Sequence, residues 1–192
     1  PIYGANQQVI ALHRGDAKET ATQMRQAGMS YVRDYVPWSW VEKEKGKYKI
    51  PDENWEQIKA YKEGGITPLM MLGFTNRYYD NNKTPCSDEA IQGYANYAAF
   101  IAKELKDYTN IFEIWNEWNG GEDFNPSQAP PEDYARLIKV AYKAMKAANP
   151  DVIVLGLTTS GLDVEWAERV FAAGGLDYMD GLALHPYMWT PG

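Results

Sequence analysis

The sequence has little cysteine, histidine or excess basic charge, and each shortage excludes a class of function. Cys86 is the only cysteine in 192 residues, which excludes an intrachain disulfide and a cluster of thiolate metal ligands. The two histidines form no His-x-His pair, and no carboxylates cluster in the sequence, so we expect no metal site and no cofactor. A net charge of −7 argues against a nucleic-acid partner, because binding phosphates requires an excess of Lys and Arg.

Long apolar runs and glycine-rich loops are also missing. No apolar run approaches the roughly 20 residues that span a bilayer, so we predict no membrane span. Residues 4–9, after the first predicted strand, do not form a glycine-rich phosphate loop, which disfavours a nucleotide-binding doubly wound sheet. No Gly-x-Ser-x-Gly elbow occurs, and no lysine lies in or just after the last predicted strand, so a serine hydrolase and a Schiff-base aldolase are disfavoured.

The patterns that are present alternate between strand and helix. Short apolar segments predict six strands, at residues 2–5, 31–35, 67–72, 111–115, 152–157 and 181–184. Apolar residues at helical spacing predict five helices, at residues 16–27, 52–63, 91–105, 134–148 and 164–173. Asp16 and Ser87 suit helix N-caps, and Pro131 suits the first turn of a helix.

Strands that alternate with helices predict a parallel sheet in an α/β fold. No linker or low-complexity segment interrupts residues 1–192, so we expect a single domain. We predict a (β/α)8 TIM barrel, of which this chain supplies about six strands and five helices. A closed barrel typically needs about 250 residues, so strands seven and eight are predicted to be missing. A second chain or fragment would complete the barrel.

The segment 111–119, Ile-Phe-Glu-Ile-Trp-Asn-Glu-Trp-Asn, is the most informative part of the chain. A buried strand there would deliver Asn116 and Glu117 at its C-terminal end, where the active sites of such barrels lie. Glu117 suits a general acid/base for glycosidic cleavage, and Asn116 suits a ligand for a sugar hydroxyl. The alternative is that the pair begins an ordinary polar loop.

Glu113 lies four residues earlier on the same predicted strand, about 13 Å away at about 3.3 Å per residue. A retaining pair of carboxylates needs about 5–5.5 Å, so Glu113 is not expected to be the partner of Glu117. We expect Glu113 to be a buried structural carboxylate or to make a surface contact.

Other polar residues also end predicted strands. Arg33 could keep an active-site carboxylate ionised, and the alternatives are a pair with Asp34 or a solvated strand end. His185 and Tyr187 could orient a carboxylate or a sugar hydroxyl, whereas a structural histidine is the alternative. His13, in the first loop, is expected to have no catalytic role.

Tryptophan is abundant, and five of the seven lie at or just after predicted strand ends. Flat sugar faces stack on such rings. Four of these tryptophans are predicted to bind substrate: Trp38, Trp40, Trp118 and Trp189. Core packing, or docking of another protein, is the alternative for each ring.

Three motifs in order along the chain resemble a known family. They are Tyr-Val-Arg at 31–33, Phe-Glu-Ile-Trp-Asn-Glu at 112–117 and His-Pro-Tyr at 185–187. The chain resembles the clan of retaining (β/α)8 glycoside hydrolases with an Asn-Glu acid/base at strand four. It is most similar to family 39 and family-39-like endoglycosidases, and next to family 5 cellulases. Trp118 departs from the pattern, because many relatives have proline there.

The resemblance implies that Glu117 is the acid/base and that Asn116 binds the hydroxyl next to the anomeric carbon. It also implies that Arg33, His185 and Tyr187 support a nucleophilic glutamate at the tip of strand seven, which no residue of this chain matches. It further implies a polysaccharide or oligosaccharide substrate and an extracellular or periplasmic location. The assembled barrel would then hydrolyse glycans, and the isolated chain would be inactive. A non-catalytic glycan-binding or scaffold fragment is the alternative.

Overall fold

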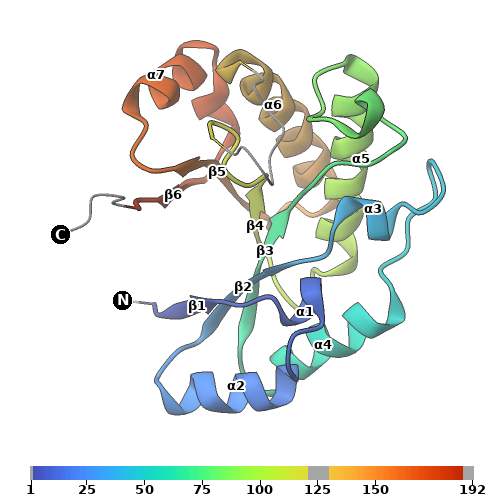
Figure 1. The fold of residues 1–192 in the computed structure, drawn as a ribbon, viewed down its shortest axis with the longest axis vertical. Helices are drawn as coiled ribbons and strands as arrows, with labels where there is room; N and C mark the ends of the chain where they lie inside the picture. The colour runs from blue at the N-terminus through green and yellow to red at the C-terminus, as the bar shows by residue number, and fades with distance from the viewer. Residues whose placement is uncertain (1, 121–129, 188–192) are drawn as a thin grey trace.

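The computed structural model describes residues 2–120 and 130–187, and these form one six-stranded parallel sheet with helices packed around it (Figure 1). Each strand pairs in parallel with the next in the chain, so the spatial order is β1-β2-β3-β4-β5-β6. The strands are β1 (Gly4–Asn6), β2 (Tyr31–Tyr35), β3 (Thr67–Leu72), β4 (Ile111–Ile114), β5 (Ile153–Ser160) and β6 (Gly181–His185).

Strands in sequential order, joined by helical crossovers, are the arrangement of a (β/α)8 barrel rather than of a doubly wound sheet, whose order reverses. The sheet is therefore a partial TIM barrel of six parallel strands, as the sequence predicts. Within the described ranges, β1 pairs only with β2 and β6 pairs only with β5 among the parallel strands.

Five longer helices match the five predicted ones to within a few residues. They are α2 (Ala17–Gln26), α4 (Asp52–Glu63), α5 (Asp88–Glu104), α6 (Pro131–Ala148) and α7 (Val164–Ala172). Asp16 and Ser87 cap α2 and α5 by accepting the backbone N–H of Glu19 and Ala90, and Pro131 begins α6.

Two four-residue helices were not predicted, α1 (Val9–Leu12) and α3 (Trp38–Val41), because one turn is too short to show a helical period. Two short 3₁₀ turns, η1 (Asp80–Asn82) and η2 (Gly175–Tyr178), also appear. Both four-residue helices follow a strand directly, α1 after β1 and α3 after β2. They therefore lie at the C-terminal side of the sheet, where barrel active sites are built.

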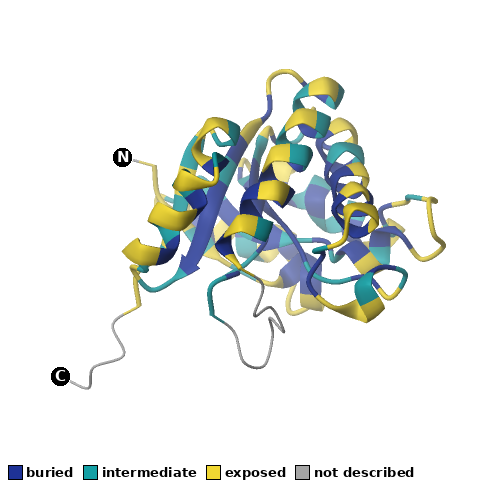
Figure 2. Cartoon of the chain, turned by 90° about the horizontal axis from the view of Figure 1, so that it is seen from above, coloured by how far each residue is buried: buried dark blue, intermediate teal, exposed yellow. Residues whose placement is uncertain are grey.

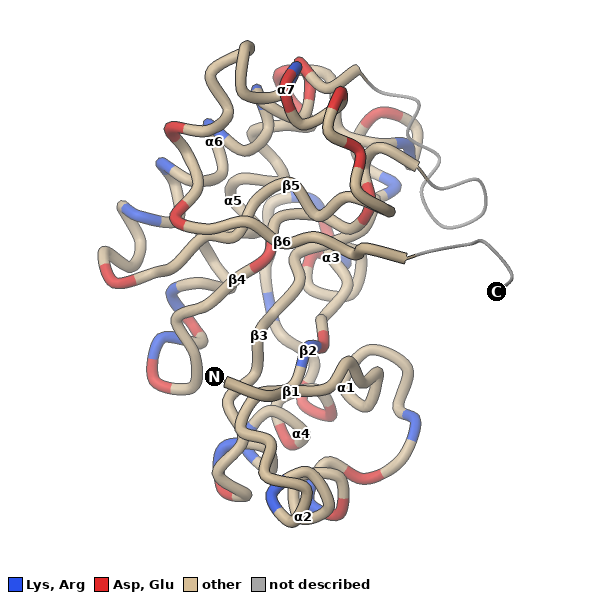
Figure 3. The backbone as a smooth tube through the Cα atoms, turned by 90° about the vertical axis from the view of Figure 1, so that its left-hand side faces the viewer, with Lys and Arg blue, Asp and Glu red and all other residues tan. Residues whose placement is uncertain are grey.

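The hydrophobic core lies between the sheet and the helices. Buried residues line the four inner strands, β2 to β5, and the outward faces of the helices are exposed (Figure 2). Phe112 and Ile114 of β4 are fully buried, as are Leu137 and Ile138 on the apolar stripe of α6. Most charged residues lie on the helices and loops (Figure 3), whereas Arg33 and Asp34 lie on β2 and Glu113 lies on β4. In the described part of the chain, no helix has the length and apolarity to cross a membrane.

The strand predicted at residues 111–115 ends one residue earlier than expected. Trp115 adopts a φ of 65°, in the left-handed region, and Glu117 follows with a φ of 49°. Such angles cost about 1–3 kcal/mol each for residues other than glycine, so the surrounding packing must hold them. The chain therefore turns out of the sheet immediately after Ile114.

Candidate active site

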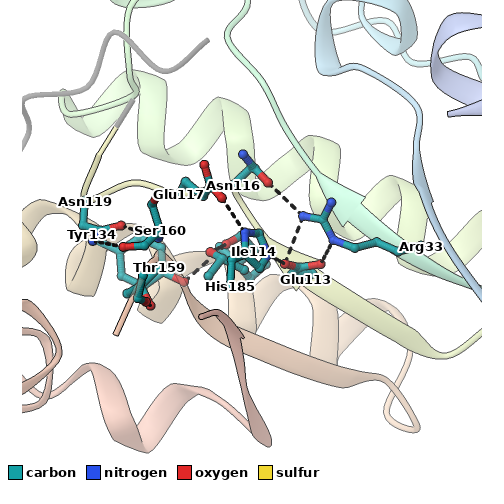
Figure 4. Close-up of polar contacts among 12 residues, drawn as sticks. Arg33, Glu113, Ile114, Asn116, Glu117, Asn119, Tyr134, Thr159, Ser160 and His185 are labelled. Atoms are coloured by element: carbon teal, nitrogen blue, oxygen red, sulfur yellow. Dashed lines mark hydrogen bonds and ion pairs between the residues drawn. The ribbon is translucent and has the colours of Figure 1, made fainter. Parts of the chain in front are cut away.

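Five of the polar residues singled out in the sequence converge at the C-terminal end of the sheet. Figure 4 shows four of them, Arg33, Asn116, Glu117 and His185. Arg33 comes from β2, and Asn116 and Glu117 come from the turn after β4. His185 ends β6, and Tyr187 follows it. Parallel strands bring their carboxyl ends to one edge of a sheet, which is why residues so far apart in sequence meet here.

Arg33 connects strands β2 and β4 through the site. Its Nε donates to Glu113 Oε2 at 2.6 Å and its Nη2 to Glu113 Oε1 at 3.1 Å. The same Nη2 donates to Asn116 Oδ1 at 2.9 Å. The expected alternative, an Arg33–Asp34 pair, is wrong, because adjacent strand residues point to opposite faces and Asp34 bonds elsewhere. The guanidinium therefore fixes the orientation of the Asn116 amide.

His185 lies between the two glutamates. Its Nδ1 is 2.7 Å from Glu117 Oε1, and its Nε2 is 3.3 Å from Glu113 Oε1. The hydrogen bond to Glu113 and the contact with Glu117 outweigh desolvation and raise the pKa of His185 above its usual value of 6.5. A protonated imidazole donates from both nitrogens, which suits a position between two carboxylates.

Glu113 is a buried structural carboxylate, one of the two roles expected from the sequence. Its side chain is 2% exposed. Burial alone would raise the pKa of Glu113, but the hydrogen bonds from His185 and Arg33 lower it below its usual value of 4.5. Glu113 is therefore held as an anion beneath the site.

The spacing of about 13 Å expected between Glu113 and Glu117 assumed an extended chain. That assumption fails at Trp115, where the chain leaves the strand with a positive φ. Both glutamates consequently contact the two nitrogens of the same imidazole. Glu113 and Glu117 are therefore coupled through His185, which the sequence pattern did not indicate.

Asn119 holds the turn that carries Asn116 and Glu117. Its Nδ2 donates to the carbonyl oxygen of Ser160 at 3.1 Å and to Asp163 Oδ2 at 3.0 Å. Its Oδ1 accepts the backbone N–H of Ser160 at 2.8 Å. The turn after β4 is thus tied to the end of β5 (Figure 4). Sequence reasoning missed this role, because an asparagine in a polar loop carries no distinguishing pattern.

These side chains face a hollow of about 750 Å³. Its lining consists of Asn6, Gln8, Leu12, Arg14, Arg33, Tyr35, Met71, Phe74, Asn116, Glu117, His185 and Tyr187. Burial, and then the Glu117 carboxylate to which it hydrogen-bonds, raise the pKa of Tyr187 above its usual value of 10. The size and the mixed apolar and polar lining suit a small organic ligand such as a sugar.

Two aromatic residues in the hollow were missed. Tyr35 is the last residue of β2, and Phe74 lies just after β3. Their rings meet edge to face, with their centroids 5.5 Å apart. Both are half-buried and line the hollow. The sequence signal for Tyr35 is its position at the end of the predicted strand 31–35.

Two of the predicted substrate-binding tryptophans are buried in the core, so that prediction is wrong for them. Trp38 is 1% exposed, and its Nε1 donates to Glu42 Oε2 at 2.6 Å. Trp118 is 0% exposed and packs against Trp115 and Tyr134. A ring without exposed surface has no face to offer a sugar.

Trp40 does not line the hollow either. Trp40 stacks on His13 at 5.4 Å and borders a separate surface depression with Val41 and Tyr48. Trp189 lies outside the described residues. In the ranges 2–120 and 130–187, no group of three or more His, Cys, Asp or Glu residues is placed to hold a metal ion.

A partial (β/α)8 barrel with an Asn-Glu pair after β4 and a His-x-Tyr motif at β6 defines the class of (β/α)8 glycoside hydrolases. Residues 3–177 match the model of the family described as cellulase (glycosyl hydrolase family 5). The chain belongs to this family. No curated protein matches it.

Solved structures extend the likeness to related families. A family 39 glycoside hydrolase from the gut symbiont Bacteroides cellulosilyticus WH2 is 31% identical, with a TM-score of 0.81 over 96% of this chain and 38% of that one. A monomeric β-xylosidase from Caulobacter crescentus CB15 is 21% identical, with a TM-score of 0.70 over 95% of this chain and 41% of that one.

An exo-β-1,4-mannosidase from Opitutaceae bacterium strain TAV5 is 20% identical, with a TM-score of 0.67 over 81% of this chain and 31% of that one. The last two likenesses show the fold alone. The chain thus spans between 31% and 41% of the length of these three structures.

Proposed function

We propose that the barrel containing these six strands is a retaining glycoside hydrolase for a β-linked polysaccharide or oligosaccharide, with Glu117 as its acid/base. The observation that carries the proposal is the setting of Glu117 in the hollow. His185 Nδ1 lies 2.7 Å from its carboxylate, and the neighbouring Asn116 amide is held by Arg33 at 2.9 Å. The match to the family described as cellulase supports a β-linked glycan substrate.

In the proposed first step, a glutamate at the tip of strand seven attacks the anomeric carbon. The glycosidic C–O bond breaks, and Glu117 gives its proton to the leaving oxygen. In the second step, Glu117 takes a proton from water as that water attacks the anomeric carbon, and the nucleophile leaves. Asn116 would hold the hydroxyl next to the anomeric carbon through both steps.

Glu113 is unsuitable as the nucleophile in this proposal. Its side chain is 2% exposed, and Arg33 and His185 occupy its oxygens. A nucleophile must reach the anomeric carbon, so the second carboxylate has to come from residues other than Glu113. We assign Glu113 the role of holding His185 and Arg33 in place beneath the sugar.

Replacing Glu117 with Gln in the complete barrel tests the assignment. General acid/base catalysis typically contributes about 10²–10⁴-fold, so turnover of an unactivated β-glycan should fall by about that factor. A substrate with a good leaving group needs little protonation and should lose less in the first step. With that substrate, added azide should restore turnover of the variant and yield a β-glycosyl azide. Azide attacks the glycosyl-enzyme intermediate without needing a general base.

Glu165→Gln is the matched control, because Glu165 is an exposed residue in the first turn of α7 and is not among the residues that line the hollow. It should retain the activity of the unmodified barrel. An E117Q barrel that hydrolyses unactivated glycan at the original rate would refute Glu117 as the acid/base.

Glycan binding without hydrolysis is the second candidate, and one observation favours it for the isolated chain. Of the described residues that line the hollow, only Glu117 carries a carboxylate. A retaining mechanism needs two. We therefore expect the 192-residue chain alone to be inactive, and detectable hydrolysis by this chain alone would contradict that expectation.

A further inference from the structure

Asp34 is a buried carboxylate that the proposed chemistry does not use. It lies on β2 between Arg33 and Tyr35, and its side chain points away from the hollow because neighbouring strand residues face opposite sides. Asp34 is 1% exposed. Its Oδ2 accepts the backbone N–H of Ile10 at 2.9 Å, and its Oδ1 accepts that of Ala11 at 3.2 Å.

The two amides that Asp34 binds belong to α1, a helix of only four residues. Isolated helices much shorter than about 12 residues are unstable, so α1 depends on contacts outside itself. Its N-cap, Gln8, makes no side-chain hydrogen bond to it. A second buried side chain holds it from α4, where Asn54 Nδ2 donates to the carbonyl oxygen of Ile10 at 2.7 Å.

The segment containing α1 forms one wall of the hollow. Gln8 and Leu12, at its two ends, and Arg14 just beyond it line the same hollow as Glu117. Asp34 binds the middle of this segment on its buried side, through the backbone N–H groups of Ile10 and Ala11. Asp34 Oδ1 also accepts the backbone N–H of Tyr35, a fourth lining residue, at 2.9 Å. The position of the three lining residues on the α1 segment therefore depends on a buried carboxylate behind them.

We propose that Asp34 is a positioning residue for the glycan site, which holds α1 so that Gln8, Leu12 and Arg14 bind a part of the glycan away from the bond that breaks. The inference rests on the proposed function for its substrate, but the anchoring of α1 is measurable without it. Loss of the anchor should weaken substrate binding while the chemistry at Glu117 proceeds.

The anchor also depends on pH. Burial raises the pKa of Asp34 to about 6, against the opposing effect of its backbone hydrogen bonds. The backbone hydrogen bonds lower the pKa of Asp34, so releasing α1 while Asp34 stays buried favours the protonated carboxyl, and the hold on α1 weakens as the pH falls through this value. Global unfolding, which exposes Asp34 to water, has the opposite pH dependence. The side chains of α1 itself are apolar, and the titratable groups nearest Asp34 are Tyr35 and, from α4, Tyr61.

One further titratable contact acts on the same segment. His13, just after α1, lies 3.2 Å from Glu53 Oε1 and stacks on Trp40 at 5.4 Å. These contacts hold the same segment from its exposed side. The test therefore includes His13→Gln, which removes this contribution and leaves Asp34 in place.

The test compares the complete barrel with its D34N variant. Asn presents one acceptor oxygen where the carboxylate presents two, so the amides of Ile10 and Ala11 should exchange hydrogen about tenfold faster at pH 7. After correction for intrinsic rates, their protection should fall between pH 7 and pH 5 in the unmodified protein and in H13Q, but not in D34N. The KM for a β-linked oligosaccharide should rise about tenfold in D34N, with kcat changed less than twofold.

Unchanged exchange and unchanged KM in D34N would overturn the proposal, and so would a fall in kcat without a rise in KM. If D34N does not fold, Asn54→Ala replaces it, because it removes the other buried bond to Ile10 and should raise exchange and KM in the same direction. A barrel that neither binds nor hydrolyses glycans would refute the proposed function alone, since the exchange measurement still decides whether Asp34 holds α1.

Discussion

Arg33 grips Glu113 with two parallel hydrogen bonds, Nε to Oε2 at 2.6 Å and Nη2 to Oε1 at 3.1 Å. The pair is poorly exposed to solvent, with 20% of the Arg33 side chain and 2% of the Glu113 side chain exposed. Two opposite charges removed from water in this way stabilise each other, whereas burying either charge without its partner costs folding free energy. The pair joins β2 to β4 at the floor of the hollow.

Replacing Arg33 with Met should therefore destabilise the protein by about 3–5 kcal/mol, because it leaves the Glu113 carboxylate buried without its main partner. The double variant R33M/E113Q should be less destabilised than the sum of the two single variants, because it removes the charge along with its partner. Urea unfolding of the four proteins measures both effects. Strictly additive losses would mean that the two residues do not interact energetically.

The fold was largely predictable from the sequence because its signals are local. Strands 31–35 and 67–72 and helix 52–63 have the predicted bounds, since apolar runs and helical spacing mark them directly. The order of the strands follows from the alternation of strand and helix. The short helices α1 and α3 escaped prediction because four residues contain no period to detect.

The site was predictable only in part, because its geometry depends on contacts between distant segments. Strand ends indicate which residues reach the active edge, and this located Asn116, Glu117 and His185 in one hollow. The position of a residue at a strand end does not reveal whether its side chain points into the hollow or into the core. Trp38 and Trp118 were therefore predicted to bind substrate, whereas both are buried in the core. The left-handed turn at Trp115, which brings Glu113 and Glu117 to one histidine, has no sequence signal, since tryptophan rarely adopts it.

The contribution of the Glu113–His185 pair to stability should depend on pH in a defined window. The pKa of Glu113 is lowered, so its contribution is present above its usual value of 4.5 and is lost as the pH falls below it. The pKa of His185 is raised, so its contribution is present below its usual value of 6.5 and is lost as the pH rises through the higher value in the folded state. Between about pH 4.5 and 6.5 the pair contributes most.

The measurement is the difference in unfolding free energy between the unmodified protein and H185N, taken from pH 4 to pH 9. A difference is required because the pKa of Asp34 is raised to about 6, so Asp34 lowers the stability as the pH rises from 3.8 to 6. Asp34 is present in both proteins and its effect cancels. A difference that does not vary with pH would contradict the assignment of a charged pair.

The aromatic residues around the site should separate into two groups when they are replaced in the complete barrel. Trp118 is 0% exposed and packs on Trp115 at 5.1 Å, so Trp118→Phe should cost about 1–3 kcal/mol of stability through lost packing. The glycan affinity of W118F, measured in the folded protein, should stay within twofold of that of the unmodified barrel.

Phe74 is half-buried in the lining of the hollow, so Phe74→Ala should weaken glycan binding by about five- to tenfold. This is the loss expected for a stacking contact of about 1 kcal/mol or slightly more. Titration calorimetry and thermal unfolding on the same two variants distinguish the roles, and a loss of affinity in W118F with none in F74A would restore the surface role that the sequence pattern suggested for Trp118.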